Sequence, residues 1–355
     1  MFFNEESKSA LDAIEYGHLI AYAPIAFQAT RSLRNLGILD EIIKAGREGI
    51  TLEDIVSKVD VSHYGVRVLV EAGLGIGLIL ENDGKYTLTK TGIFIMNDKM
   101  TRINMDFVHD VCYEGMFYLE ESILNGKPEG LKVFGEKWNT IYEALSSLPP
   151  QVQKSWFAFD HYYSDDALAQ VLPLVFKDKP AKILDIGGNT GKWSLACMNY
   201  DKDIRMGIVD LPGQINMAKK NIESQGFIDR VSFHELNILN EDNKLPKGYN
   251  AIWMSQFLDC FSEAEIVSIL KRCYEALTED DTVYILEPFW NRQRFKAGAF
   301  SLQQTSLYFT ALANGNSQMY HSDVFVKNVL EAGFEVKEIH DRIGISQTLL
   351  KCKKK

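Results

Sequence analysis

Three glycines follow an apolar segment that carries a single acid. Residues 183–194 read ILDIGGNTGKWS, in which Asp185 precedes Gly187, Gly188 and Gly191. Glycine allows a tight backbone turn and lets a ligand come close to the backbone. A carboxylate beside such a turn is placed to meet an ammonium group of a ligand, directly or through water. These residues predict a turn that binds a small molecule; a tight turn without a ligand is the alternative.

A second acid, Asp210, follows Gly191 by 19 residues and ends the next apolar segment. In nucleotide-binding sheets, an acid at this position receives the two hydroxyls of a ribose. The alternative is that Asp210 only caps the helix that follows. The first interpretation predicts a ligand that contains a nucleoside.

Two kinds of phosphate-binding loop do not match the glycine turn. A P-loop requires GxxxxGK[ST], but Ile186 stands at its first glycine and Trp193 at its last position. A dinucleotide-binding loop requires GxGxxG, but Asn189 and Lys192 replace its second and third glycines. The ligand that remains is a nucleoside with an amino-acid portion and without a pyrophosphate. S-adenosylmethionine has these parts.

Short apolar segments alternate with helical ones from residue 180 onward. The predicted strands lie in AKILDIGG, IRMGIVDLP, RVSFHELNIL, YNAIWMSQFL, TVYILEPFW and FEVKEIHDRIGISQTLLKCK. This alternation predicts an α/β domain with a doubly wound, Rossmann-like parallel sheet. Ligands bind such sheets at the carboxyl ends of the strands, near the first strand-to-helix turn. The glycine turn occupies that place.

Residues 183–287 resemble the core of the class I S-adenosylmethionine-dependent methyltransferases. LDIGGNTG is similar to the family's cofactor loop, IVDLP to its ribose-binding strand end and ILEP to its fifth strand. With its N-terminal region and the segment SDVFVKNVLEAGFEVKEIHD, the whole chain resembles the small-molecule O-methyltransferases of the caffeate and acetylserotonin type. The resemblance implies methyl transfer to a small aromatic or otherwise flat acceptor, preferably on oxygen, with S-adenosylhomocysteine as the product.

The resemblance also implies which residues bind the cofactor. In FHELNIL, Asn237 stands where the family has an acid near the adenine. Its amide can still accept a hydrogen bond from the adenine amino group. The implied cofactor residues are Asp185, Gly187, Gly188, Gly191, Asp210, Leu211, Asn237, Ile238 and Ser255.

The segment MSQFLDCFSEAE departs from the family where the chemistry takes place. In the resembled enzymes a His-Asp pair follows the fourth strand, and the histidine is the general base on the acceptor hydroxyl. Aligned through the Ser-Glu that follows, Asp259 stands at the histidine position and Cys260 at the aspartate position. Burial among aromatic side chains would raise the pKa of Asp259 toward that of a working base.

We therefore expect Asp259 to act as the base and Glu287 to orient the acceptor or its partner. His161, in FDHYYSDD, is a third candidate, with a core or surface role as its alternative. Two other functions remain open. The acceptor atom is carbon or nitrogen and needs no histidine, or the protein binds S-adenosylmethionine or an apolar ligand without turnover and serves regulation or scaffolding.

Helical segments and a hairpin precede the predicted sheet. FQATRSLRNLGILDEIIKAG predicts a helix that stops at Gly46, and Thr51 with Asp54 predicts a capping box. A third helix then runs into a hairpin whose turn is Asp83-Gly84. This order of elements predicts a winged helix.

A winged helix raises the question of DNA binding. Residues 1–99 contain 10 Lys or Arg against 14 Asp or Glu, and the third helix is largely apolar. Phosphate binding requires a basic face. We therefore expect no nucleic-acid partner. The apolar helix instead predicts a symmetric homodimer through this domain, and the resemblance implies the same.

The sequence as a whole predicts three regions. Residues 1–99 form a winged-helix dimerisation domain, 100–179 a helical linker whose aromatic residues line the substrate pocket, and 180–355 the methyltransferase domain. The net charge of -10 disfavours an anionic membrane surface as a partner. The acidic first residues do not resemble a secretory signal. The five scattered cysteines include no CxxC pair, so we expect no disulfide framework or metal site and a cytoplasmic location.

Overall fold

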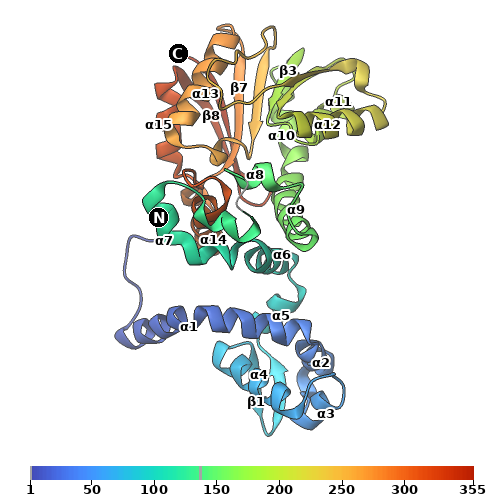
Figure 1. Cartoon of the computed structure of the whole chain (residues 1–355), viewed down its shortest axis with the longest axis vertical. Coiled ribbons are helices and arrows are strands. Elements are labelled where there is room, and N and C mark those ends of the chain that lie inside the picture. The colour runs from blue at the N-terminus through green and yellow to red at the C-terminus, as the bar shows by residue number, and fades with distance from the viewer. Residues whose placement is uncertain (1, 136–137) are drawn as a thin grey trace. The chain divides into compact units, whose positions relative to one another are not determined.

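The computed structural model describes residues 2–135 and 138–355 (Figure 1). The chain forms two compact units, Met1–His109 and Asp110–Lys355. The division into three regions at residues 99 and 179 remains a prediction. In the described part of the chain, no helix is both long and apolar enough to cross a membrane.

The N-terminal unit contains the predicted winged helix, α2 to β2, between a long first helix and two further helices. Its elements are α1 (Ala10–Asn35), α2 (Ile38–Ala45), α3 (Leu52–Val56), α4 (His63–Ile76), β1 (Ile79–Asn82), β2 (Lys85–Leu88), α5 (Lys90–Asn97) and α6 (Lys99–Phe107). Thr51 Oγ1 accepts the Asp54 amide at 3.2 Å, which is one of the two bonds of the predicted capping box, and donates to Asp54 Oδ2 at 2.7 Å. The hairpin turn lies at Asp83 and Gly84, whose φ angles of 51° and 75° suit a tight hairpin.

The single helix predicted for residues 27–46 is wrong, because the chain breaks there into α1 and α2. Gly37 lies between the two helices with φ 78°. Glycine adopts this left-handed conformation without a Cβ clash, so it ends one helix and starts the next at a new angle. The helical spacing of apolar residues continues across the break because both helices contribute to one buried cluster, through Leu33, Ile38, Leu39 and Ile42.

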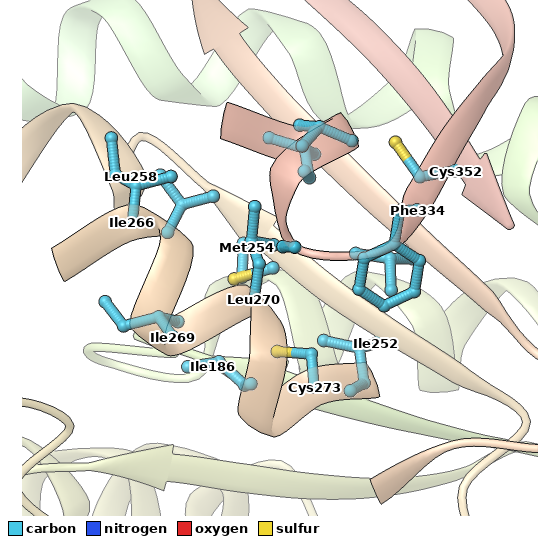
Figure 2. Packing of buried hydrophobic residues seen from close by; sticks show 14 of the residues in the cluster. Ile186, Ile252, Met254, Leu258, Ile266, Ile269, Leu270, Cys273, Phe334 and Cys352 are labelled. Carbon is cyan, nitrogen blue, oxygen red and sulfur yellow. The ribbon is translucent and has the colours of Figure 1, made fainter. Parts of the chain in front are cut away.

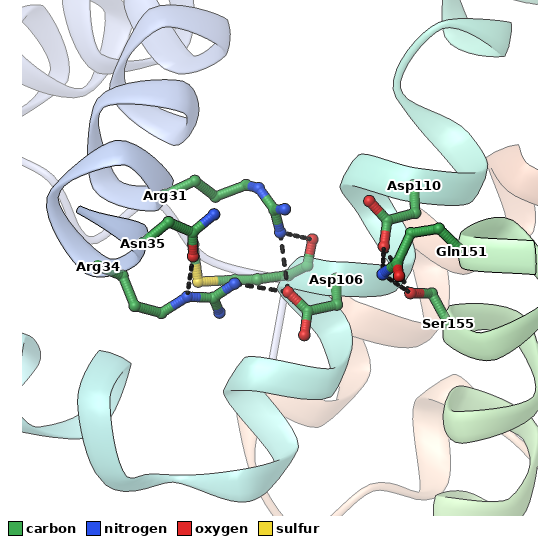
Figure 3. Close-up of polar contacts among 8 residues, drawn as sticks. Arg31, Arg34, Asn35, Asp106, Asp110, Gln151 and Ser155 are labelled. Carbon is green, nitrogen blue, oxygen red and sulfur yellow. Dashed lines mark hydrogen bonds and ion pairs between the residues drawn. The ribbon is translucent and has the colours of Figure 1, made fainter. Parts of the chain in front are cut away.

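Two arginines of α1 are paired with one acid of α6. Asp106 Oδ1 lies 2.8 Å from Arg31 Nη1 and 2.6 Å from Arg34 Nη2 (Figure 3). The two arginine side chains are largely buried, whereas Asp106 is partly exposed. Charge-assisted hydrogen bonds of this kind are stronger than neutral ones. They join the C-terminal part of α1 to α6.

A seven-stranded sheet of order β5-β4-β3-β6-β7-β9-β8 forms the centre of the C-terminal unit. The strands are β3 (Lys182–Ile186), β4 (Arg205–Asp210), β5 (Val231–Glu235), β6 (Ala251–Ser255), β7 (Thr282–Pro288), β8 (Phe334–Ile343) and β9 (Gln347–Lys354). The first five pair in parallel, which confirms the doubly wound fold. The last predicted segment forms two antiparallel strands, because the chain reverses at Gly344 with φ 55°.

Helices cover both faces of this sheet. On one face, α13 (Glu263–Ala276) and α15 (Ser322–Glu331) share a buried cluster with strand residues such as Ile186, Ile252 and Met254 (Figure 2). On the other face lie α10 (Leu168–Phe176), α11 (Lys192–Tyr200) and α12 (Pro212–Ser224). There the rings of Trp193 and Trp253 stack with centroids 3.9 Å apart. Burial on both faces explains why the strands are apolar throughout.

The remaining α-helices described in this unit are α7 (Leu119–Asn125), α8 (Ile141–Ala144), α9 (Pro150–Ser164) and α14 (Lys296–Tyr308). Side chains hold α9 in place. Asp110 accepts hydrogen bonds from Gln151 Nε2 at 2.8 Å and Ser155 Oγ at 2.6 Å (Figure 3). One residue further on, Trp156 Nε1 donates to Tyr308 Oη of α14 at 2.8 Å. The position of α9 is therefore fixed by polar contacts as well as by packing.

Candidate active site

The glycine turn follows β3 directly. Gly187 and Gly191 have φ angles of 75° and 79°, in the left-handed region that favours glycine. A Cβ atom on Gly187 would lie 2.3 Å from the Phe257 ring, and one on Gly188 would lie 2.8 Å from Ile208. Close packing therefore requires glycine at positions 187 and 188, which the sequence did not reveal. Their predicted role in admitting a ligand is additional to it and remains a prediction.

Asp185 lies on β3 before the glycine turn and is 2% exposed. Ser194 Oγ donates a hydrogen bond to Asp185 Oδ2 at 2.8 Å. Burial raises the pKa of Asp185 to about 7, and the charge of Asp210 contributes to the rise. A cation beside this carboxyl group would favour its ionised form. The environment thus suits the predicted contact with an ammonium group.

Asp210 ends β4 and connects that strand to the glycine turn. Its Oδ2 accepts the Asn189 amide at 2.8 Å, and its Oδ1 accepts the Leu211 amide at 2.7 Å. Burial raises the pKa of Asp210 above its usual value. Neither of these hydrogen bonds comes from an amide within α12 (Pro212–Ser224), so Asp210 does not cap that helix through the contacts of the described residues. Each carboxylate oxygen has a further lone pair for a hydroxyl donor.

The other predicted cofactor residues lie at the carboxyl ends of neighbouring strands. Leu211 follows β4, Asn237 and Ile238 follow β5, and Ser255 ends β6. Because β5, β4, β3 and β6 are parallel neighbours, these residues lie at one edge of the sheet with the glycine turn. Arg272 of α13 donates to the Ile238 carbonyl and so restrains the segment after β5. The structure brings the predicted residues together, and their contacts with a cofactor remain a prediction.

Glu287 lies on β7, 1% exposed, and holds the segment that follows β6. Its Oε1 accepts the amides of Phe257 at 3.0 Å and Leu258 at 2.8 Å. Its Oε2 is buried and has no hydrogen-bond partner in the described part of the chain. Burial, and next the charge of Asp259, raise the pKa of Glu287 well above its usual value. Glu287 thus positions the backbone that carries Asp259.

Asp259 lies in the short 3₁₀ helix Leu258–Cys260 after β6 and is 4% exposed. The Cys260 thiol lies 3.5 Å from Asp259 Oδ1, and Tyr142 Oη donates to Cys260 Sγ at 3.0 Å. Burial raises the pKa of Asp259 to about 7, and the charge of Asp160 adds to the rise. Burial therefore moves the pKa of Asp259 toward neutral pH, the range in which a general base works.

The third catalytic candidate, His161, lies half-buried on α9 with its ring centroid 6.0 Å from that of Phe157. The neighbouring residue on α9, Asp160, is the one whose charge raises the pKa of Asp259 and of Tyr308. The residue of α9 whose charge affects Asp259 is thus Asp160, which directly precedes the predicted histidine.

Three residues of this site were not predicted from the sequence: Asp160, Tyr142 and Tyr308. Asp160 had a local signal, because it is an acid inside the aromatic segment FAFDHYY. Tyr142 had none, since the cysteine that it contacts lies 118 residues further along the chain.

The fold and the site together define an α/β protein with a ligand-binding turn after its first parallel strand and a buried acid beside that turn. Residues 117–335 match the O-methyltransferase domain, and residues 15–86 match the Dimerisation2-like domain. The first match spans more than half of the chain, so the chain belongs to the O-methyltransferase domain family. The predicted fold class and family are confirmed, and with them a methyltransferase that depends on S-adenosylmethionine.

Two curated relatives align over most of their length. L-tyrosine C(3)-methyltransferase from Streptomyces lavendulae is 23% identical over 318 residues, which cover 89% of this chain and 85% of that protein. Acetylserotonin O-methyltransferase 1 from Oryza sativa subsp. japonica is 23% identical over 368 residues and covers 96% of each.

Among solved structures, the chain is similar to the apo form of the S-adenosylmethionine-dependent methyltransferase SibL. The TM-score is 0.70 with 18% identity, covering 95% of this chain and 98% of that one. Human N-acetylserotonin methyltransferase in complex with SAM gives a TM-score of 0.65 with 16% identity and covers 99% of each chain. At these identities the structural similarity bears on the fold alone.

Proposed function

We propose that this protein transfers the methyl group of S-adenosylmethionine to an oxygen atom of a small aromatic acceptor, with Asp259 as the general base. The main support for this proposal is the environment of Asp259. It is a buried carboxyl group with a pKa of about 7, on a segment that packs against the glycine turn through Phe257. A base of this kind is what a phenol acceptor needs, since a phenol with a pKa of about 10 is not ionised at neutral pH.

The residues present suit S-adenosylmethionine. Asp210 offers a free lone pair on each carboxylate oxygen at the end of β4, as a ribose diol would require. Asp185 is a buried acid suited to the ammonium group, and Asn237 an exposed amide suited to the adenine. When bound, S-adenosylmethionine supplies a methyl group on a sulfonium, which is already an activated donor. The chain has to bind it, exclude water and position the acceptor.

In this proposal Asp259 accepts the proton of the acceptor hydroxyl on its carboxylate. Glu287 keeps Asp259 in place by holding the Phe257 and Leu258 amides. A buried carboxylate is a stronger base than an exposed one because desolvation disfavours its charged form. His161 stays the third candidate for the base, because the charge that raises the pKa of Asp259 comes from the neighbouring residue, Asp160.

Incubation with methyl-labelled S-adenosylmethionine and a cell extract tests the proposal directly. We expect a labelled small molecule in which the methyl group is bound to oxygen, as identified by mass spectrometry and NMR. If the folded protein binds S-adenosylmethionine but labels nothing, it acts as a binding protein for regulation or scaffolding, and the enzymatic proposal is wrong.

Methylation of carbon is the second candidate function. It is favoured by the relative named L-tyrosine C(3)-methyltransferase, which aligns with 89% of this chain. Asp259 would then ionise a phenol so that the ring carbon beside the oxygen becomes nucleophilic. NMR of the labelled product separates a methyl ether from a ring methyl group, and it would equally detect methylation of nitrogen.

We further propose a homodimer formed through the N-terminal unit. The first part of α1 exposes apolar side chains, which we call the α1 apolar face: Leu11, Ile14, Leu19, Ile20, Tyr22 and Ile25. Residues 15–86 match a dimerisation domain, which favours a second copy of this chain as the partner. In this proposal residues 1–99 dimerise, 100–179 line the acceptor pocket and 180–355 bind the cofactor, in the cytoplasm.

A further inference from the structure

The Oε2 atom of Glu287 is buried and has no hydrogen-bond partner in the described part of the chain. The side chain is 1% exposed, and its Oε1 already accepts two backbone amides. Leaving a buried polar atom unpaired costs free energy, and the cost is larger for a charged group. A donor from a bound molecule would remove that cost.

The surroundings of Glu287 are acidic. The charge of Asp259 is the strongest charge acting on Glu287, and the charge of Asp160 acts in turn on Asp259. Three carboxyl groups are thus linked electrostatically: Glu287 on β7, Asp259 in the 3₁₀ helix after β6, and Asp160 on α9. The pKa values of Glu287 and Asp259 are both raised, and a cation bound beside these two groups would favour their ionised forms.

Aromatic side chains border the same region. Tyr142 contacts Cys260, next to Asp259, and Tyr308 accepts the hydrogen bond of Trp156 from α9. The charge of Asp160 acts on Tyr308, and that of Asp259 acts on Tyr142. Aromatic rings bind flat molecules, and their faces also attract cations.

We propose that the acceptor is a small aromatic molecule that carries a protonated amine, and that this amine donates a hydrogen bond to Glu287 Oε2. An ammonium group has three donors and compensates the negative charge of the neighbouring acids. Its hydrogen bond to a carboxylate is charge-assisted and therefore stronger than a neutral one. The proposal rests on the proposed function only in placing the acceptor at this site.

Three matched probes test the role of the charge. Tyramine, 4-ethylphenol and 3-(4-hydroxyphenyl)propionate share a phenol ring and differ in carrying a cation, no charge or an anion. Their dissociation constants are measured by calorimetry on the full chain saturated with S-adenosylhomocysteine, which has no sulfonium charge. We expect tyramine to bind about tenfold tighter than 4-ethylphenol, and the anion to bind most weakly. Equal binding of the three, or tighter binding of the anion, would overturn the proposal.

The variant Glu287→Gln tests the residue. Its amide oxygen can still accept the Phe257 and Leu258 amides, whereas the side chain can no longer become negatively charged when a cation binds. We expect the preference for tyramine to fall to about twofold or less, with the affinity for S-adenosylhomocysteine unchanged. Glu263→Gln is the matched control, because Glu263 is an exposed acid at the start of α13, and it should keep the tenfold preference. A preference that survives in Glu287→Gln contradicts the proposal.

A measurement on the unaltered protein covers the case in which Glu287→Gln does not fold. Among the described residues, Asp259 and Cys260 after β6 interact electrostatically with Glu287. Asp160 on α9, Tyr142 on α8 and Tyr308 on α14 interact in turn with Asp259 or Cys260. Asp259, with a pKa of about 7, gains its charge between pH 6 and pH 8. The affinity for tyramine should therefore rise over this interval while that for 4-ethylphenol does not. A flat profile for tyramine speaks against the proposal.

The outcomes keep this inference separate from the proposed function. If label is transferred to neutral phenols and the probes show no preference for the cation, only the inference fails. If the cationic probe is preferred but no methyl group is transferred, only the function fails. If Glu287→Gln weakens S-adenosylmethionine relative to S-adenosylhomocysteine and the probes bind equally, the carboxylate serves the sulfonium and the inference is wrong.

Discussion

Asp259 and Glu287 are two buried carboxyl groups with raised pKa values and different contacts. Glu287 binds two backbone amides, whereas Asp259 has a thiol at 3.5 Å. The less restrained of the two, Asp259, is the better placed to exchange a proton with a bound acceptor.

Asp259→Asn should lower the rate of methyl transfer by about 10²–10⁴-fold, the usual contribution of a general base. Asparagine has the same shape but cannot take a proton. The rate is measured with labelled S-adenosylmethionine and the identified acceptor, and cofactor affinity by calorimetry should stay the same. Normal turnover in Asp259→Asn together with an inactive His161→Ala would move the base to α9.

The rate should also depend on pH in a defined direction. Asp259 acts as a base only when ionised, so kcat should rise with pH up to its pKa of about 7 and level off above it. The residual activity of Asp259→Asn should lack this rise. A pH–rate profile between pH 5 and pH 9 measures both. A rate of the unaltered protein that is constant through pH 7 would mean that no group with this pKa is required.

Asp210→Ala should weaken the binding of S-adenosylmethionine by about 1.5–3 kcal/mol, the scale of hydrogen bonds to a charged group. The reason is the loss of the oxygens that face the proposed ribose and hold the Asn189 amide. Calorimetry with S-adenosylmethionine measures the change, and circular dichroism checks that the variant is folded. Unchanged affinity in a folded variant would place the cofactor elsewhere.

At the scale of elements, α13 follows the segment that carries Asp259, and a capping box starts it. Ser262 Oγ accepts the Glu265 amide at 3.4 Å, and Glu265 Oε2 accepts the Ser262 amide at 2.8 Å. Ser262→Ala should lower the free energy of unfolding by about 1 kcal/mol, and the Tm by about 2–4 °C. Thermal denaturation measures this, with Ser224→Ala near the exposed end of α12 as the control expected to change little. Equal effects of the two would mean that the cap is not what stabilises α13.

The sequence predicted those elements whose signals are local. The strand β3, the glycine turn and Asp210 were found because periodicity and glycine spacing span only a few residues. The break at Gly37 was missed because apolar spacing continued through it. The antiparallel pair β8 and β9 was missed because pairing depends on where the chain reverses. The contact of Tyr142 with Cys260 joins distant segments, and no spacing within one segment encodes it.

At the scale of the whole molecule, the α1 apolar face leads us to expect a dimer. A large exposed apolar surface is rarely left uncovered in a monomer. Light scattering at micromolar concentration should give twice the chain mass, and Ile14→Glu with Ile25→Glu should give a monomer, because two charges would be buried in the interface. Glu15→Gln, on the same exposed helix, is the control that should stay dimeric. A monomer in the unaltered protein would refute the dimer.

The contact of the Phe257 ring with Gly187 makes the cofactor turn and the catalytic segment depend on each other's sequence. No side chain larger than hydrogen can stand at 187 while an aromatic ring stands at 257 in this position. Phe257 precedes Asp259 by two residues, so a displaced ring would also shift the carboxyl group. Substitutions at the two positions should therefore be epistatic, with effects that do not add. Evolution of this chain toward a new acceptor is therefore limited at position 257, because a substitution there would also disturb the packing of Gly187 in the cofactor turn.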